Sequence, residues 1–339
     1  MHISTKSSNC IPFCIGQIDE DKGYVHVFDD TTLEIIMKTV DTISDFVQYL
    51  TKKEEFIENG NLFAASGEDD LLAYYLKNIN ENGEHTFFAD KYDSMNKLVI
   101  SEGIWDDFSN HPSRIAQIEA NKISYSWDAL IEKFIYHIIT GTSYNMSHPN
   151  IKSQEEGLRF LAKENRTRRR LLAKSLLDFI NKIPPNLRGT RLLLPSNTGD
   201  PYYLFLLLPR LNNISEEEYR KTRRELLQCY LLTLKLRYQN AMDIIGLAME
   251  TGTSSERSED FMYLDAREWT DEENEKAKAL EEDLIRGGLL VNREMFRNVI
   301  SEYPDNIPEK IIKGMKGNER NKPCPCNSGK KFKNCCGRT

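Results

Sequence analysis

The sequence predicts an α+β protein, with a body of helices and antiparallel strands followed by a small cysteine-rich module at the C-terminus. Helical periodicity in the first half and paired strand patterns in the second half predict the body. Hydrophobic residues make up 40% of the 339 residues and charged residues 29%, a mixture that can bury a core. Four of the seven cysteines lie in the last 16 residues, which predicts a separate module there.

The first half of the chain is predicted to consist mainly of helices. Residues 23–37 read as a strand, a turn and the start of a helix or second strand. The next helix, over residues 41–58, has Asp41 or Thr42 available to cap it. Two further helices, over 67–78 and 125–140, are separated by strand and loop at 85–100.

Three capping boxes mark helix starts in the second half. Each box is a Ser or Thr with Glu three residues later, a pair that satisfies the free amides of a first helical turn. The first is predicted to open one long helix that ends at about Lys182. The three pairs are Ser153 with Glu156, Ser215 with Glu218, and Thr270 with Glu273.

Strand patterns lie between these helices. Residues 190–194 and 202–208 flank a Gly-containing turn and are predicted to form a hairpin. Residues 243–249 and 261–264 flank a polar loop and predict a second antiparallel pair. The chain therefore divides into an N-terminal α+β region (1–150), a helix-rich α+β region (151–303), a basic tether (304–322) and the cysteine module (323–339).

Charge is distributed unevenly along the chain. Residues 310–339 contain nine Lys or Arg and one acid, so they carry +8, while the other 309 residues carry −15. This basic tail is expected to bind something anionic, a nucleic acid or lipid surface, or a protein partner. No apolar run reaches the about 18 residues that span a bilayer. The N-terminus lacks a signal sequence, so we expect a cytoplasmic protein.

The cysteine module has the spacing of a metal site. A Cys-x-Cys pair, eight intervening residues and a Cys-Cys pair supply four soft donors, which suit tetrahedral Zn²⁺. A closed four-sulfur site leaves no position for water, so the zinc would be structural. Iron would also accept these thiolates, and two disulfides or free thiols are the non-metal alternatives. The predicted metal ligands are Cys324, Cys326, Cys335 and Cys336.

Basic side chains surround the four cysteines. They would stabilise the ionised sulfurs and leave the tail positive after the metal binds. We predict that the same side chains bind the anion or partner. They are Lys330, Lys331, Lys333 and Arg338.

The segment CPCNSGKKFKNCC resembles the SEC-C motif, found at the C-terminus of the bacterial translocation motor SecA and on many otherwise unrelated bacterial proteins. The resemblance covers 324–337 and places the four cysteines on the motif's ligand positions, with Cys336 where SecA often has His. It implies zinc binding and docking to a partner, which in the motor's case includes a chaperone, ribosomes or anionic lipid. The body resembles bacterial proteins of unknown activity that carry this tail. It has no GxxxxGK[ST] phosphate loop, so a motor activity is not implied.

Two other patterns in the body have a functional and a structural interpretation. The cations Arg159, Lys163, Arg166, Arg170 and Lys174 follow one stripe of the predicted helix and could hold nucleic-acid phosphates. A solvated, ion-paired face is the structural interpretation. Acidic residues could instead ligate Mg²⁺ in a nuclease or phosphodiesterase, possibly in defence, or simply favour helix first turns. These acids are Glu68, Asp69, Asp70, Glu102, Asp106, Asp107, Glu250 and Asp260.

Overall fold

The computed structural model places the chain in two compact units, each built from segments that are distant in sequence. Unit 1 contains residues 1–123, 164–170 and 299–339, and unit 2 contains 124–163 and 171–298. The structure describes residues 13–15, 24–59, 62–80, 83–88, 98–140, 151–197, 199–210, 214–252, 257–290, 301–304, 320–322, 331 and 333. The α+β class predicted from the sequence is confirmed.

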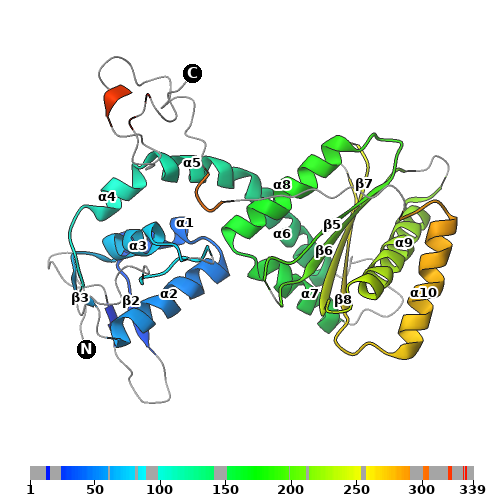
Figure 1. Ribbon diagram of the computed structural model, residues 1–339, viewed down its shortest axis with the longest axis horizontal. Helices are drawn as coiled ribbons and strands as arrows, with labels where there is room; N and C mark the ends of the chain where they lie inside the picture. Colours follow the sequence, from blue (N-terminus) through cyan, green and yellow to red (C-terminus); the bar gives the residue numbers. More distant parts are fainter. Residues whose placement is uncertain are drawn as a thin grey trace. The chain divides into compact units, whose positions relative to one another are not determined.

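Unit 1 begins with two short strands and three helices, whose starts follow local capping chemistry (Figure 1). Asp29 caps helix α1 (Asp30–Thr39), because its carboxylate accepts the amide of Thr32. Thr42 caps α2 (Ile43–Glu58) in the same way, as predicted. Helix α3 (Glu68–Lys77) follows Gly67. Before them lie β1 (Phe13–Ile15) and β2 (Val25–Val27), which pair antiparallel.

A second pair of strands and two helices complete the first half of the chain. Strands β3 (Leu62–Ala65) and β4 (Leu98–Ile100) pair in parallel. Helices α4 (Ile104–Ser109) and α5 (Pro112–Asn121) were not predicted, and a 3-10 turn (Lys122–Ser124) follows them. Helices α2 and α3 build the core of unit 1 with the segment near residue 87, where the rings of Phe56 and Phe87 stack 4.7 Å apart.

Unit 2 is organised around a four-stranded sheet in the order β5-β6-β7-β8. Strands β5 (Gly189–Leu193) and β6 (Tyr202–Leu208) form the predicted antiparallel hairpin. Strands β7 (Asp243–Glu250) and β8 (Glu259–Asp265) form the second predicted antiparallel pair. The central pair, β6 and β7, is parallel, which the sequence did not predict. Helix α9 (Glu216–Arg237) connects these two strands, as a parallel connection requires.

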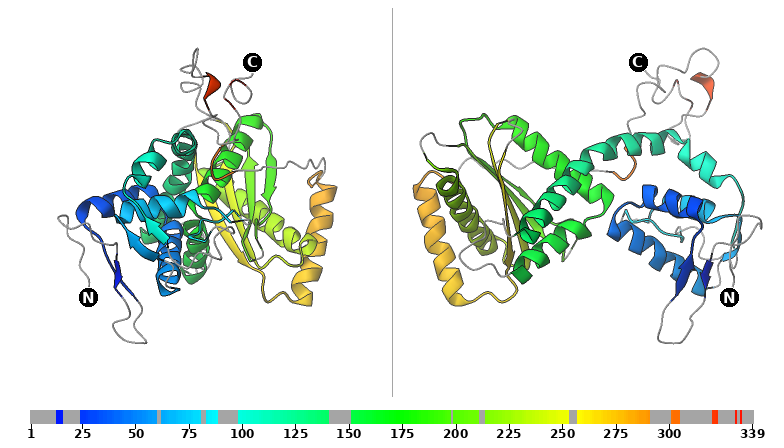
Figure 2. Two further views of the ribbon diagram at one scale, coloured as in Figure 1. Left: turned by 60° about the vertical axis from the view of Figure 1, so that its left-hand side comes forward. Right: turned by 180° about the vertical axis from the view of Figure 1, so that it is seen from behind.

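Helices cover both faces of this sheet (Figures 1 and 2). On one face, Leu204, Leu206 and Ile244 pack with α9, and α10 (Asp271–Arg286) lies beside α9. On the other face, Trp127 of α6 (Tyr125–Ile139) contacts the rings of Tyr203 and Phe205. Alternate residues of β6 therefore face opposite layers, and the period of two buries both sides of the strand.

The long helix predicted after Ser153 is two helices, and this is a correction. Helix α7 (Ile151–Lys163) starts before Ser153, so Ser153 lies inside the helix and is not its cap. Helix α8 (Arg166–Lys182) begins after Asn165, whose side-chain oxygen accepts the amide of Arg168 at 2.8 Å. Asn165 thus acts as an N-cap and separates the two helices. The boxes at Ser215 and Thr270 are confirmed as caps of α9 and α10.

Within the described residues, every helix is too short or too polar to span a lipid bilayer.

Candidate functional site

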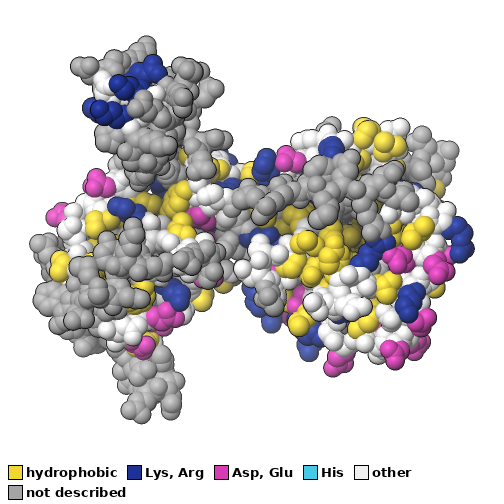
Figure 3. All heavy atoms as spheres, in the orientation of Figure 1, with side chains coloured by type: hydrophobic (Ala, Val, Ile, Leu, Met, Phe, Trp, Pro, Cys, Tyr) yellow, Lys and Arg dark blue, Asp and Glu magenta, His cyan; other side chains and the backbone are white. Residues whose placement is uncertain are grey.

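The predicted zinc ligands Cys324, Cys326, Cys335 and Cys336 lie outside the described residues, as do Lys330 and Arg338. Lys331 and Lys333 are described, and both are exposed. Arg320 and Lys322 lie in the same tail and are also exposed. Figure 3 shows these dark-blue side chains gathered on the described part of the tail. All four belong to the basic tail recognised in the sequence, and Lys331 and Lys333 are also among the predicted partner-binding residues.

The described part of the chain brings no group of three or more His, Cys, Asp or Glu side chains into a metal-binding arrangement. In unit 1, Glu68 is buried and accepts a hydrogen bond from Lys53 at 2.6 Å. Asp70 accepts the amide of Trp105 at 2.9 Å and so holds the start of α4. The acids of this first helical turn therefore have structural partners. The neighbouring pair, Asp106 and Asp107, is exposed on α4.

The two candidate metal-binding acids that lie in unit 2, Glu250 and Asp260, have cationic partners. Asp260, nearly buried, lies between Arg220 and Arg223, with its carboxylate oxygens 2.7 Å and 2.5 Å from the two guanidinium groups. Glu250 accepts a hydrogen bond from Ser258 at 3.1 Å and lies 3.5 Å from Arg210. These carboxylates neutralise arginines at one end of the sheet, so they give the nuclease alternative no support.

The basic stripe predicted over residues 159–174 is divided between the two helices. Arg159 pairs with Glu155 on the surface of α7, and Lys174 pairs with Asp178 on α8. Arg166 and Arg170 are buried in unit 1, where Arg166 lies 2.8 Å from Asp41. Buried, paired arginines cannot present a continuous face to a nucleic acid, but Arg166 and Arg170 do not lie on a solvated face either. The interpretation as a solvated, ion-paired face holds at Arg159 and Lys174.

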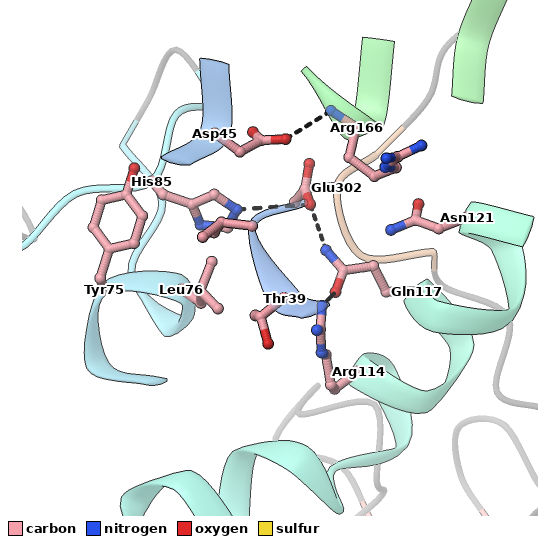
Figure 4. Close-up of a pocket in the computed structure, with 11 residues that line it drawn as sticks. Thr39, Asp45, Tyr75, Leu76, His85, Arg114, Gln117, Asn121, Arg166 and Glu302 are labelled. Atoms are coloured by element: carbon pink, nitrogen blue, oxygen red, sulfur yellow. Dashed lines mark hydrogen bonds and ion pairs between the residues drawn. The ribbon is translucent and has the colours of Figure 1, made fainter. Parts of the chain in front are cut away.

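A polar pocket in unit 1 was not predicted (Figure 4). At its centre lies Glu302, whose carboxylate accepts hydrogen bonds from the Gln117 amide and the Thr167 hydroxyl. The Nε2 atom of His85 lies 3.6 Å from the same carboxylate. Arg114 donates in turn to the side-chain oxygen of Gln117. These residues are up to 217 positions apart in sequence, and no local motif could have connected them.

Other groups of the pocket complete its polar lining. Asp45 accepts the main-chain amide of Arg166 at 2.8 Å and the hydroxyl of Thr42 at 2.6 Å. Burial raises the pKa of Asp45, and these hydrogen bonds oppose that effect. The hydroxyl-bearing ring of Tyr75 lies beside His85, with ring centroids 5.5 Å apart. The pocket thus combines the carboxyl groups of Asp45 and Glu302 with several hydrogen-bond donors.

Low pH is expected to reduce the stability of unit 1 because it protonates the Glu302 carboxylate. Burial raises its pKa, but the hydrogen bond and charge of His85, with the Thr167 hydroxyl, outweigh burial and lower the pKa to about 2. A depressed pKa stabilises the fold above the unfolded-state value near 4.5 and loses that effect as pH falls toward 2. We expect Glu302→Gln to reduce the free energy of unfolding by about 3 kcal/mol at pH 7.

Urea unfolding at pH 7 and at pH 2.5 checks this expectation. The gap between the unsubstituted protein and Glu302→Gln should shrink to below about 1 kcal/mol at the lower pH, because pH 2.5 lies well below the unfolded-state value near 4.5 and close to the folded-state pKa of about 2. A matched substitution, Glu119→Gln, changes an exposed acid of α5 and should have little effect at either pH. An equal gap at both pH values would contradict the assignment.

Comparison with known proteins identifies the end of the chain. Residues 320–338 match the family model of the SEC-C motif. This segment is a SEC-C motif. The match includes the exposed cations Arg320, Lys322, Lys331 and Lys333, so the basic surface in Figure 3 belongs to the SEC-C motif.

The similar proteins share this motif region. Protein translocase subunit SecA of Trichlorobacter lovleyi is 40% identical over 67 residues, which cover 20% of this chain and 7% of that protein. SecA of Sulfurovum sp. is 39% identical over 71 residues, or 20% of this chain and 8% of that protein. SecA of Clostridium kluyveri is 52% identical over 46 residues, or 13% and 6%. The chain thus spans less than a tenth of these relatives, and no solved structure matches it.

Proposed function

We propose that the SEC-C motif binds one Zn²⁺ through Cys324, Cys326, Cys335 and Cys336. The donor set fits this ion, since four cysteine sulfurs are the soft ligands of a closed tetrahedral zinc site. The ion would supply folding free energy to the motif and would have no catalytic role. Iron is the competing ion, and elemental analysis distinguishes the two.

We further propose that this zinc-stabilised tail docks an anionic partner in the cytoplasm. The observation that carries the proposal is the exposed basic surface of Arg320, Lys322, Lys331 and Lys333 within the motif. The body carries a net charge of −15, so the tail is the part of the chain suited to a negative surface. A nucleic acid, an anionic membrane and an acidic protein all present such a surface.

A charge-reversal experiment tests the docking proposal. Lys331→Glu/Lys333→Glu is expected to weaken binding to the anionic partner about 30-fold or more, since each lysine near an anionic surface contributes about 1 kcal/mol. Binding of the full chain is measured to single-stranded RNA, to vesicles with and without anionic lipid, and to an acidic polypeptide. The probe that binds in a salt-dependent manner identifies the class of partner.

The matched control is Lys77→Glu/Lys122→Glu, which changes the net charge equally at two exposed positions outside the motif. This control should retain binding. Docking through the SEC-C surface is refuted if both double variants lose binding equally, or if the unsubstituted protein binds none of the probes.

A further inference from the structure

The segment 301–304, called the strap here, is attached to unit 1 through contacts distant in sequence. The strap comes immediately before the basic tether that leads to the SEC-C motif. The residues on either side, 291–300 and 305–319, lie outside the described residues. The strap therefore fixes to unit 1 the point of the chain at which the tether begins.

The Glu302 side chain is held as a bound carboxylate would be. Gln117 from α5 and Thr167 from α8 each donate to one of its two oxygens, and His85 approaches from a third direction. Figure 4 shows Gln117 and His85 pointing toward Glu302 from separate elements. Hydrogen bonds to an ionised group are stronger than those between neutral groups, so this arrangement recognises a carboxylate specifically.

Residues of unit 1 also bind the main chain of the strap and its aromatic residue, Tyr303. Arg170 donates to the carbonyl oxygens of Ser301 and Glu302, at 2.5 Å and 3.2 Å. The Tyr303 hydroxyl donates to the Leu76 carbonyl oxygen at 2.7 Å. The Tyr303 ring makes edge-on contacts with the rings of His85 and Phe108. Side chains from several elements thus bind the Glu302-Tyr303 segment as a receptor binds a peptide.

The core of unit 1 does not depend on this segment. Its buried residues come from several elements of the first 123 residues, including Ile36 of α1, Tyr49 of α2 and Leu72 of α3, while Tyr303 is only partly buried and packs against this cluster. The strap's remaining contacts are hydrogen bonds and an ion pair. Detaching the strap would therefore expose a polar pocket and one aromatic ring, and the helices would keep their packing.

We propose that the strap is a releasable internal ligand of the unit 1 pocket, which can detach while the rest of unit 1 stays folded. Because the strap immediately precedes the tether in sequence, the pocket would control whether this point of the chain is fixed to unit 1.

Cleavage by a Glu-specific protease tests the proposal in the full chain, because the chain contains its own reporters. Cleavage after Glu302 reports release of the strap. Cleavage after Glu68, which is buried and bonded to Lys53, reports unfolding of unit 1. Cleavage after Glu102, which is exposed in the turn before α4, sets the rate for an accessible site. Mass spectrometry of the fragments separates the three rates, and with dilute protease each rate follows the population of the open form.

A variant that lacks the two donors to Glu302 but keeps residues 301–304 unchanged makes the test specific. Gln117→Ala/Thr167→Val is expected to accelerate cleavage after Glu302 at least about tenfold, because two hydrogen bonds to a charged group are lost. Cleavage after Glu68 should rise by a similar factor, because the variant destabilises the attached form relative to every open form, but it should stay at least about tenfold slower than cleavage after Glu302 in both proteins. The control Glu119→Ala, which removes an exposed neighbour on α5, should leave both rates unchanged.

Two results would overturn the proposal. If Glu302 and Glu68 are cut at the same rate in the unsubstituted chain, the strap opens only when unit 1 unfolds and is a fixed part of its fold. If Glu302 of the unsubstituted chain is cut as fast as Glu102, the pocket does not hold the strap in solution.

Discussion

A Cys335→Ser variant of the full chain is expected to lose the bound zinc that the unsubstituted protein should contain at about one ion per chain. Serine is a poor ligand for zinc at neutral pH because its hydroxyl stays protonated, whereas a cysteine sulfur binds as the thiolate. We expect the affinity for zinc to fall by more than 100-fold. Changes to groups that only hydrogen-bond to the metal ligands typically cost about 10–100-fold.

Cys229→Ser is the matched control for this variant. Cys229 is a free, partly buried thiol in α9 of unit 2, and burial raises its pKa, which makes it a poor thiolate donor. Elemental analysis after dialysis should find zinc in the control and not in Cys335→Ser. Acidification should release the zinc with a steep pH dependence, since four thiolates take up protons. A purified protein with neither zinc nor iron would refute the metal site.

The variant that loses zinc should also lose the folded structure of the motif. A segment of 16 residues cannot bury enough apolar surface to fold alone, so its structure is expected to depend on the ion. Amide exchange in residues 320–338 should therefore become faster in Cys335→Ser, while exchange in α9 stays unchanged. Fast exchange in the metal-loaded, unsubstituted protein would show that the ion does not order the segment.

Local chemistry in the sequence predicted helix starts well where the chain enters the helix extended. Thr42, Ser215 and Thr270 all have extended backbone and accept an amide of the first turn. The same pattern failed at Ser153 because residues 151 and 152 are already helical. The cap that separates α7 from α8 is Asn165, a residue type that also caps helices but lacks a Glu three positions later.

Contacts between distant segments limited the prediction of the site. The four cysteines proposed as metal ligands are close in sequence, so their spacing alone could suggest a metal site. The pocket combines His85, Gln117 and Glu302, Thr167 donates to the same Glu302 carboxylate, and only the tertiary fold brings these residues together. The parallel pairing of β6 with β7 is likewise a non-local contact. Hydrophobic patterns define which residues form strands, but they do not define which strand each one pairs with.

Lys53→Met is expected to destabilise unit 1 by about 3–5 kcal/mol, because it leaves the carboxylate of Glu68 buried without its cation. Lys53 is fully buried in α2, and its ammonium lies 2.6 Å from Glu68 and 5.3 Å from the centre of the Phe28 ring. Tyr49 donates a second hydrogen bond to the same carboxylate. This tyrosine alone cannot neutralise the charge, so the penalty should be large.

The double variant Lys53→Met/Glu68→Leu separates the cost of an unpaired charge from the value of the pair. Replacing both partners with apolar groups of similar size removes the buried charge, so much of the stability should return. The remaining loss would reflect the Tyr49 hydroxyl, which then has no carboxylate to bind. Urea unfolding of both single variants and the double variant gives the coupling energy directly. If Lys53→Met costs less than about 1 kcal/mol, or if the two single costs simply add, then Glu68 is not held as a buried ion. Its place at the start of α3 would in that case be due to the helix dipole alone.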